Sequence, residues 1–290
     1  MLELLQLVVL GVAMGGVYAL IAVGFVIIHN VTGVINFAQG EFAMVGAMLA
    51  VGVVARGGGL PLATLVGAGG AAVVGWALYR GALVPARRAS DVVLIIITIG
   101  ASIALRGLAL VAWGSQPVTL PPFTAGGPIA FFGAVVSRQQ LWVLGITLVV
   151  MAALALFFGR TLFGAALRAT EMNRDASRLV GVSPRAMGQA AFALSAALSG
   201  LAGVAITPIG LASYDMGLML GLKGFVAAVM GGLVSVPGAV LSAFLLGVVE
   251  AVGAGVVSSA YKDAMAFVIL ILVLFVRPQG LFALGAIKRV

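Results

Sequence analysis

The sequence predicts an all-α membrane protein, and three observations support this fold class. The chain of 290 residues is 63% hydrophobic and only 8% charged, whereas soluble domains carry roughly 25% charged residues. Its apolar runs exceed the roughly 18 residues that mark a membrane-spanning helix. These runs are continuous, whereas the strands of a membrane β-barrel alternate apolar and polar residues. We therefore expect one polytopic transmembrane domain over residues 1–290, with about eight or nine helices and some re-entrant or broken segments.

The expected spans follow one another closely along the chain. They are residues 5–28, 35–55, 60–79, 91–113, 140–159, 186–208, 222–250 and 263–276. The stretch 222–250 is too long for one simple helix and contains a Gly-Gly and a Pro-Gly pair, so we expect a broken or paired segment there. Small residues four apart, at Gly11 and Gly15 and at Gly217 and Gly221, indicate closely packed helices.

The loops differ in their content of basic residues, which predicts how the chain is oriented in the membrane. Residues 80–90, residues 160–185 and the C-terminal tail carry 11 of the 16 lysines and arginines, so we expect these three segments on the cytoplasmic face. The loop 114–139 falls on the opposite, periplasmic face, carries only Arg138, and is rich in proline and glycine, which predicts a turn-rich cap. The spacing of the spans favours an N-terminus on the outside, although a re-entrant segment near 29–40 would reverse that side.

The most polar stretch of the chain lies in the second cytoplasmic loop and reads LRATEMNRDASRLVGVSPR. Residues 162–180 are expected to form a helix across the cytoplasmic face, in which Arg168 and Glu171 are spaced to form a surface ion pair. Gly181 suits the position after the helix, and the following Ser-Pro suits the start of the next span. The alternative is an ordinary solvated loop. The apolar residues among the charges favour a helix that docks onto a partner.

A second candidate for function is the stretch VINFAQGEF, in which polar residues enter a span. On a helix, Asn36, Gln39 and Gly40 would share one narrow face, and Glu41 would project from another. A charged residue at the centre of a span costs about 2.5 kcal/mol or more, so Glu41 should face protein or water. We interpret Asn36 and Gln39 as lining or bracing a translocation path. The alternative is hydrogen bonding between helices with close packing.

Several classes of function are excluded by missing residues. The chain has no cysteine and a single histidine, His29, which excludes thiolate and histidine-cluster metal sites. A serine protease would need a base beside its serine, and His29 is the one histidine that could serve. It has no G-x4-G-K-[ST] stretch and so cannot cradle ATP phosphates itself. The net charge of +8 lies in the loops and does not indicate nucleic acid. Lone polar residues near span limits are expected to snorkel to the interface: Arg106, Lys223 and Glu250. Lys262 and Asp263 are expected to form a loop pair.

Four stretches together resemble one family, the LivH-type permease subunits of ATP-binding-cassette importers of branched-chain amino acids. They are GGVYALIAVGFVIIHNVTGVINFAQGEFAMVGA at 15–47, GAALRATEMNRDASRLVGVSPRAM at 164–187, GLMLGLKGFVAAVMGGLVSVPGAVLSAFLLGVVE at 217–250, and VRPQGLF at 276–282. The resemblance covers most of the chain.

The resemblance implies a permease fold like that of type II importers, in the bacterial inner membrane, with no cofactor and no catalytic residues of its own. It implies a second permease subunit that completes a hetero- or pseudo-dimer, two cytosolic ATPase subunits, a periplasmic solute-binding protein and an amino-acid-like substrate. The cytoplasmic loop would couple to the ATPases through Gly164, Arg168, Glu171, Asn173, Asp175 and Gly181. The path would include Asn36, Gln39, Gly40 and Glu41. Urea, short amides or aromatic compounds are alternative solutes, and a stand-alone secondary transporter is the rival function.

Overall fold

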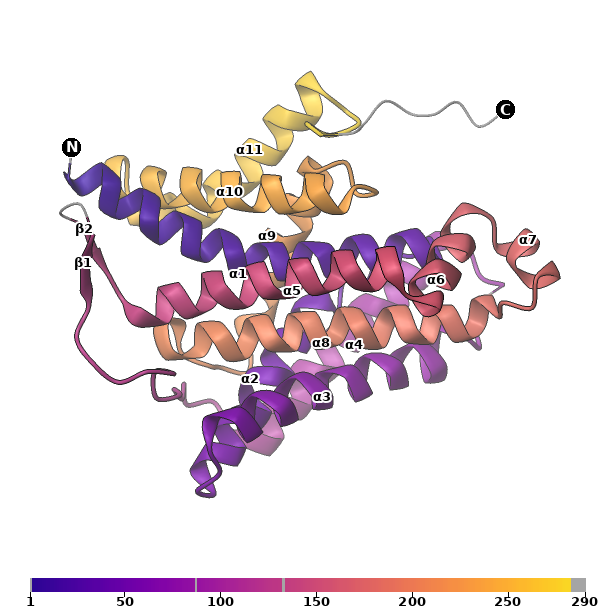
Figure 1. Ribbon diagram of the computed structural model, residues 1–290, viewed down its shortest axis with the longest axis horizontal. Helices are drawn as coiled ribbons and strands as arrows, with labels where there is room; N and C mark the ends of the chain where they lie inside the picture. Colours follow the sequence, from indigo (N-terminus) through magenta and orange to yellow (C-terminus); the bar gives the residue numbers. More distant parts are fainter. Residues whose placement is uncertain (1, 87, 132–133, 283–290) are drawn as a thin grey trace.

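The computed structural model describes residues 2–86, 88–131 and 134–282 (Figure 1). Arg87, Lys288 and Arg289, which contribute to the predicted cytoplasmic charge, lie outside the described residues. The elements in chain order are α1 (Leu2–Thr32), α2 (Gln39–Ala55), α3 (Leu60–Leu78), the π-helical turn η1 (Tyr79–Leu83), α4 (Asp91–Trp113), β1 (Ile129–Phe131), β2 (Ala134–Val136), α5 (Arg138–Arg160), α6 (Leu162–Met172), α7 (Arg174–Leu179), α8 (Pro184–Gly210), α9 (Met216–Met230), α10 (Val236–Val256), the 3-10 turn η2 (Ser259–Tyr261) and α11 (Lys262–Val276).

The all-α membrane fold is confirmed. Among the described residues, seven helical segments are long and apolar enough to cross a membrane: α1, α3 with η1, α4, α5, α8, α10 and η2 with α11. Two further apolar helices, α2 and α9, have only 17 and 15 residues. At 1.5 Å per residue they measure about 25 and 22 Å, less than the roughly 30 Å of a hydrocarbon core. The expected break within 222–250 is present, because α9 ends before Gly231 and α10 begins at Val236.

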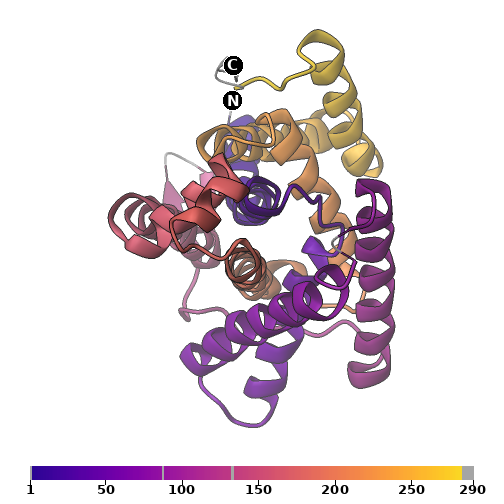
Figure 2. The same ribbon diagram turned by 90° about the vertical axis from the view of Figure 1, so that its right-hand side faces the viewer.

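Helix α1 is the centre of the bundle. It packs along α10, α8, α9 and α5 (Figures 1 and 2). Gly11 and Gly15 face α10 so closely that a Cβ atom on Gly11 would lie 2.6 Å from the Cα atom of Val248. A Cβ atom on Gly15 would lie 2.7 Å from the Cα atom of Phe244. This pair of small residues therefore serves helix packing, as its spacing predicts.

The bundle has two distinct ends (Figure 1). One end carries the N-terminus of α1 and the antiparallel hairpin of β1 and β2, joined where the Gln6 side chain bonds the backbone of Val135. The loop before this hairpin forms a bridge from Val118 to Ala212 and, as predicted, residues 114–128 contain no helix. The other end carries α6 and α7, so the predicted cytoplasmic loop and the periplasmic loop lie at opposite ends.

Helices α4, α5 and α11 are peripheral. Only 17%, 17% and 6% of their most apolar stretches are buried within the chain. Figure 2, which looks from the end that carries α6 and α7, shows α4 and α11 on one side of the bundle and α5 on another. These helices therefore present broad apolar faces to lipid or to other subunits.

Candidate functional site

The chain between α1 and α2 folds back into the protein instead of crossing it as a helix. It turns at Gly33, whose φ of +69° is in the left-handed region that favours glycine. Asn36 closes the next turn, because its Oδ1 accepts a hydrogen bond from the amide of Ala38 at 3.1 Å and its carbonyl accepts one from the amide of Gln39, also at 3.1 Å. The expectation that Asn36 shares a helix face with Gln39 and Gly40 is wrong, because α2 begins only at Gln39.

Gln39 is the polar anchor of this re-entrant segment. Its side chain is fully buried. The amide nitrogen Nε2 lies 2.7 Å from Oγ of Ser195 and 2.7 Å from Oγ of Ser199, both on α8. Its Oε1 accepts a hydrogen bond of 3.4 Å from Nδ2 of Asn36, which is also fully buried. Asn36 and Gln39 therefore brace α2 against α8 in this conformation.

Gly40 brings α2 into backbone contact with α9. A Cβ atom on Gly40 would lie 2.0 Å from the carbonyl oxygen of Gly217 and 2.6 Å from Cα of Gly221. Conversely, a Cβ on Gly217 would meet Glu41. The two glycines of α9 that are four residues apart therefore form a groove that admits the start of α2.

Glu41 connects this crossing to α4. The side chain is 1% exposed, and its Oε1 accepts a hydrogen bond of 2.9 Å from Oγ of Ser102. The same oxygen lies 3.3 Å from Nε of Arg106, forming an ion pair without a hydrogen bond at Nε. One turn before Ser102, Oγ1 of Thr98 accepts a hydrogen bond of 3.1 Å from the amide of Phe37. The expectation that Arg106 snorkels to the interface is corrected, because its guanidinium lies beside a buried carboxylate.

A pocket lies between α4 and α9 at this point. It has a volume of about 120 Å³, and Ser102 and Arg106 form its polar end. The rest of the wall is apolar and comprises Phe25, Phe37, Ile99, Ile103, Leu218, Gly221 and Leu222. Of these wall residues, sequence spacing singles out only Gly221, through its pairing with Gly217. The spacing of Thr98, Ser102 and Arg106, each four residues from the next in an apolar helix, is the one local signal for polar contacts here.

The predicted cytoplasmic helix is present but is divided in two. Thr161 caps α6 by accepting from the amide of Gly164 at 2.9 Å, and Asn173 caps α7 by accepting from the amides of Asp175 and Ala176. The break at Asn173 was not expected. Gly181 follows α7 with a φ of +84°, as predicted.

The residues named for coupling have different environments. Gly164 is buried against α5, and the side chains of Arg168, Glu171 and Asp175 are exposed. Asp175 forms an ion pair with Arg178 at 3.1 Å. Large apolar side chains also face outward here, and four of them are at least 74% exposed: Leu162, Met172, Leu179 and Val180. Exposed apolar groups amid charges, beyond the ends of the spans, are typical of a surface that binds another protein.

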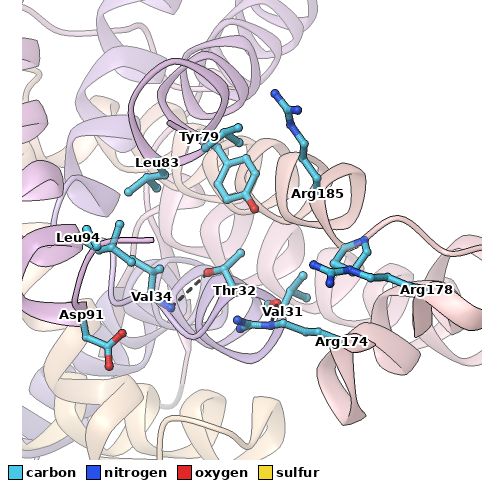
Figure 3. Close-up of a pocket in the computed structure, with 13 residues that line it drawn as sticks. Val31, Thr32, Val34, Tyr79, Leu83, Asp91, Leu94, Arg174, Arg178 and Arg185 are labelled. Atoms are coloured by element: carbon cyan, nitrogen blue, oxygen red, sulfur yellow. Dashed lines mark hydrogen bonds between the residues drawn. The ribbon is translucent and has the colours of Figure 1, made fainter. Parts of the chain in front are cut away.

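Helix α7 also contacts the end of α1. Nε of Arg174 donates a 3.1 Å hydrogen bond to the carbonyl of Val31, and the Arg174 guanidinium lies beside Gly33, where the re-entrant segment begins. Figure 3 shows Arg174, Arg178 and Arg185 around a pocket of about 320 Å³ that Val31, Thr32 and Tyr79 also line. The loop that carries α6 and α7 is thus in direct contact with the segment that carries Asn36 and Gln39.

A separate cluster of charges joins α9, α10 and α11. Nζ of Lys223 lies 2.5 Å from Oε1 of Glu250 and 2.6 Å from Oδ1 of Asp263. Nζ of Lys262 lies 3.7 Å from the same Glu250 oxygen, and the Tyr18 hydroxyl donates to Oε2 of Glu250 at 2.9 Å. Lys223 and Glu250 are buried, so the expectation that they snorkel is corrected. Lys262 and Asp263 contact this cluster, which corrects their interpretation as a loop pair.

Comparison with known proteins adds a family to this geometry. The family described as branched-chain amino acid transport system / permease component matches residues 7–274. The permease protein BraD of a high-affinity branched-chain amino acid transport system of Pseudomonas aeruginosa is 35% identical over 300 residues, which cover 99% of this chain and 98% of BraD. The corresponding protein LivH of Escherichia coli is 34% identical over 303 residues, 100% of this chain and 98% of LivH. A probable LivH of Methanocaldococcus jannaschii is 27% identical over 90% of this chain and 87% of its own length. No solved structure matches the chain.

Proposed function

The chain belongs to the family of permease components of branched-chain amino acid transport systems, and on this premise we propose that it carries leucine, isoleucine and valine inward across the bacterial inner membrane. It is one permease subunit of an ATP-binding-cassette importer. The observation that carries this proposal is the 34–35% identity to such permeases along practically the whole chain. The chain performs no covalent step, and separate ATPase subunits hydrolyse the ATP.

The importer contains four kinds of component in this proposal. A second permease subunit pairs with this chain, two cytosolic ATPase subunits bind to its cytoplasmic face, and a periplasmic binding protein delivers the amino acid. The surface for the ATPases is the cytoplasmic end of α6 and α7. Exposed Arg168, Glu171 and Asp175 supply charge there, Gly164 seats α6 on α5, and Asn173 and Gly181 set the ends of α7.

Movement of the ATPases reaches the membrane through Arg174. When the ATPases close on ATP, α6 and α7 tilt as a rigid body. Because Arg174 bonds the carbonyl of Val31 and touches Gly33, the tilt displaces the end of α1 and the re-entrant segment. Asn36, Gln39, Gly40 and Glu41 then move against α8, α9 and α4, which opens or closes the path at this level.

Reconstitution tests the proposal. The complete importer in proteoliposomes should take up labelled leucine only when two conditions are met. ATP must be enclosed inside the vesicles, where it reaches the ATPases, and the binding protein must be present outside. Uptake by this chain alone, without ATP, would instead establish a secondary transporter. Competition by unlabelled valine, urea, acetamide or phenylalanine identifies the solute class, and competition by urea or acetamide but not by valine would refute the assignment.

The docking surface has its own test. Reversing two charges together, as Arg168→Glu with Asp175→Arg, should lower the amount of ATPase that co-purifies while membrane insertion stays intact. The control is Arg56→Glu, which reverses a charge at the C-terminal end of α2, outside this surface. Wild-type co-purification of ATPase by the double variant would count against this surface.

A further inference from the structure

We propose that the pocket between α4 and α9 binds the transported amino acid itself, as a zwitterion with a branched apolar side chain. Arg106 receives the carboxylate, Ser102 receives the ammonium group, and the apolar wall receives the side chain. This inference rests on the proposed function and names the contacts made at one point of the path. Recognition of the amino acid would then occur within the membrane as well as at the binding protein.

The polar end has the donors and acceptors that a zwitterion requires. Ser102 and Arg106 are one helical turn apart, so their side chains lie on the same face of α4. The Ser102 hydroxyl donates to Glu41, which leaves its lone pairs to accept from an ammonium group. Within the described part of the chain, the Arg106 guanidinium is held by its ion pair with Glu41, and its terminal nitrogens are free to donate two parallel hydrogen bonds to a carboxylate.

Glu41 is a positioning residue in this arrangement. It is buried behind Ser102 and Arg106 and contacts both through Oε1, so it sets their orientation. Its carboxyl group pairs with the guanidinium of Arg106. This pairing holds Arg106 in place for the carboxylate of a zwitterion. Oε2 of Glu41 is buried against Gly217 without a hydrogen-bond partner among the described residues.

The apolar wall suits an aliphatic side chain. Phe25 and Phe37 both contact the ring of Phe225, with centroids 5.6 and 5.4 Å apart, and are held in place by it. Ile103 and Leu222 complete the wall from α4 and α9. The volume of about 120 Å³ is far below the ~300 Å³ or more of pockets for drug-sized ligands, so only a small side chain fits.

The position of the pocket agrees with a path across the membrane. Ser102 is the central residue of the 23-residue helix α4, and Arg106 lies one turn nearer the end that joins the periplasmic loop. The Arg106 side chain is 26% exposed. Because a charged group within a span faces protein or water, we expect the exposed part of Arg106 to face water or the second permease subunit.

Photolabelling tests the assignment. The permease and ATPase complex, without binding protein, is irradiated with the diazirine analogue of leucine, which keeps both the ammonium and the carboxylate group. We expect label on the α4 and α9 peptides that contain Ile103 and Leu222, and its loss with excess leucine. Arg106→Gln should reduce this label about tenfold, the effect expected for losing one charge-assisted contact. Arg56→Gln, a matched loss of charge outside the pocket, should not.

A second variant keeps the inference falsifiable if Arg106→Gln fails to fold. Glu41→Gln combined with Arg106→Gln removes both charges and leaves no unpaired ion in the protein, and it should also lose the label. Label at wild-type level in the double variant, or label on other peptides only, would overturn the pocket assignment. Failure of the wild-type importer to take up leucine would instead overturn the proposed function, so the two failures are distinguishable.

Discussion

The contact of α2 with α9 at Gly40 gives the sharpest prediction. In Gly40→Ala the new Cβ would lie 2.0 Å from the carbonyl oxygen of Gly217, whereas ordinary contacts begin at 3.4 Å. The two helices would have to move apart by about 1.4 Å, because the obstacles, the Gly217 carbonyl oxygen and the Gly221 N and Cα atoms, are backbone atoms that have no alternative rotamer. Overpacking of this kind costs about 1–3 kcal/mol. Gly40 is the second residue of α2, so the gain in helix propensity from glycine to alanine is below the roughly 1 kcal/mol of a helix interior and offsets only part of this cost.

Thermal unfolding of the purified protein and ATP-driven leucine uptake measure the effect. Gly40→Ala should unfold at a lower temperature and lose most uptake, because the start of α2 is displaced from α9. Gly100→Ala is the matched control, since Gly100 is inside α4 and a Cβ there meets no atom within 4 Å. It should unfold no earlier than the wild type. If both alanine variants unfold and transport alike, the close approach of α2 and α9 is refuted.

Three further predictions concern the polar contacts. Arg174→Gln should leave ATPase binding unchanged and lower leucine uptake per ATP by about fivefold or more, the scale of a typical coupling energy; an unchanged ratio contradicts coupling through Val31. Lys223→Met should lower the free energy of unfolding by about 3 kcal/mol or more, because buried Glu250 would keep only the more distant Lys262 as a cation. Adding Glu250→Gln should restore part of the unfolding temperature. An unchanged unfolding temperature in Lys223→Met would contradict the role of this ion pair. Asn36→Leu should reduce uptake more than it reduces assembly with the other subunits, and unaltered uptake would leave a packing role only.

The positions of the helices follow from local signals in the sequence. Capping residues, proline at helix starts and Gly181 after α7 each act within a few residues, so they can be read without knowledge of the fold. The break at Asn173 differs from the expected continuous helix although its cause is also local, since an asparagine side chain competes for backbone amides. The start of α2 was missed for another reason. Helical periodicity continues through Asn36, whereas the turn there depends both on the local bond from the Ala38 amide to the Asn36 side chain and on burial between other helices.

The contacts of the site depend on the tertiary fold. Glu41 was recognised as a carboxylate that must face protein or water, but its partners, Ser102 and Arg106, lie more than sixty residues away. Lys223 and Glu250 both lie in or at the end of the long apolar stretch 222–250. They can pair only because this stretch divides into α9 and α10, which pack against each other. The four-residue spacing of Thr98, Ser102 and Arg106 places them on one face of α4. It could not indicate which carboxylate that face would meet.

The ion pair between α9 and α10 has a consequence for how the protein enters the membrane during synthesis. A helix of 15 residues with a lysine inside it would be a poor substrate for the translocon, because a central lysine opposes insertion by about 2.5–3.5 kcal/mol. Glu250 follows 27 residues later and can neutralise that lysine. We therefore expect the two helices to leave the translocon together as a hairpin, with α11 joining them afterwards through Asp263.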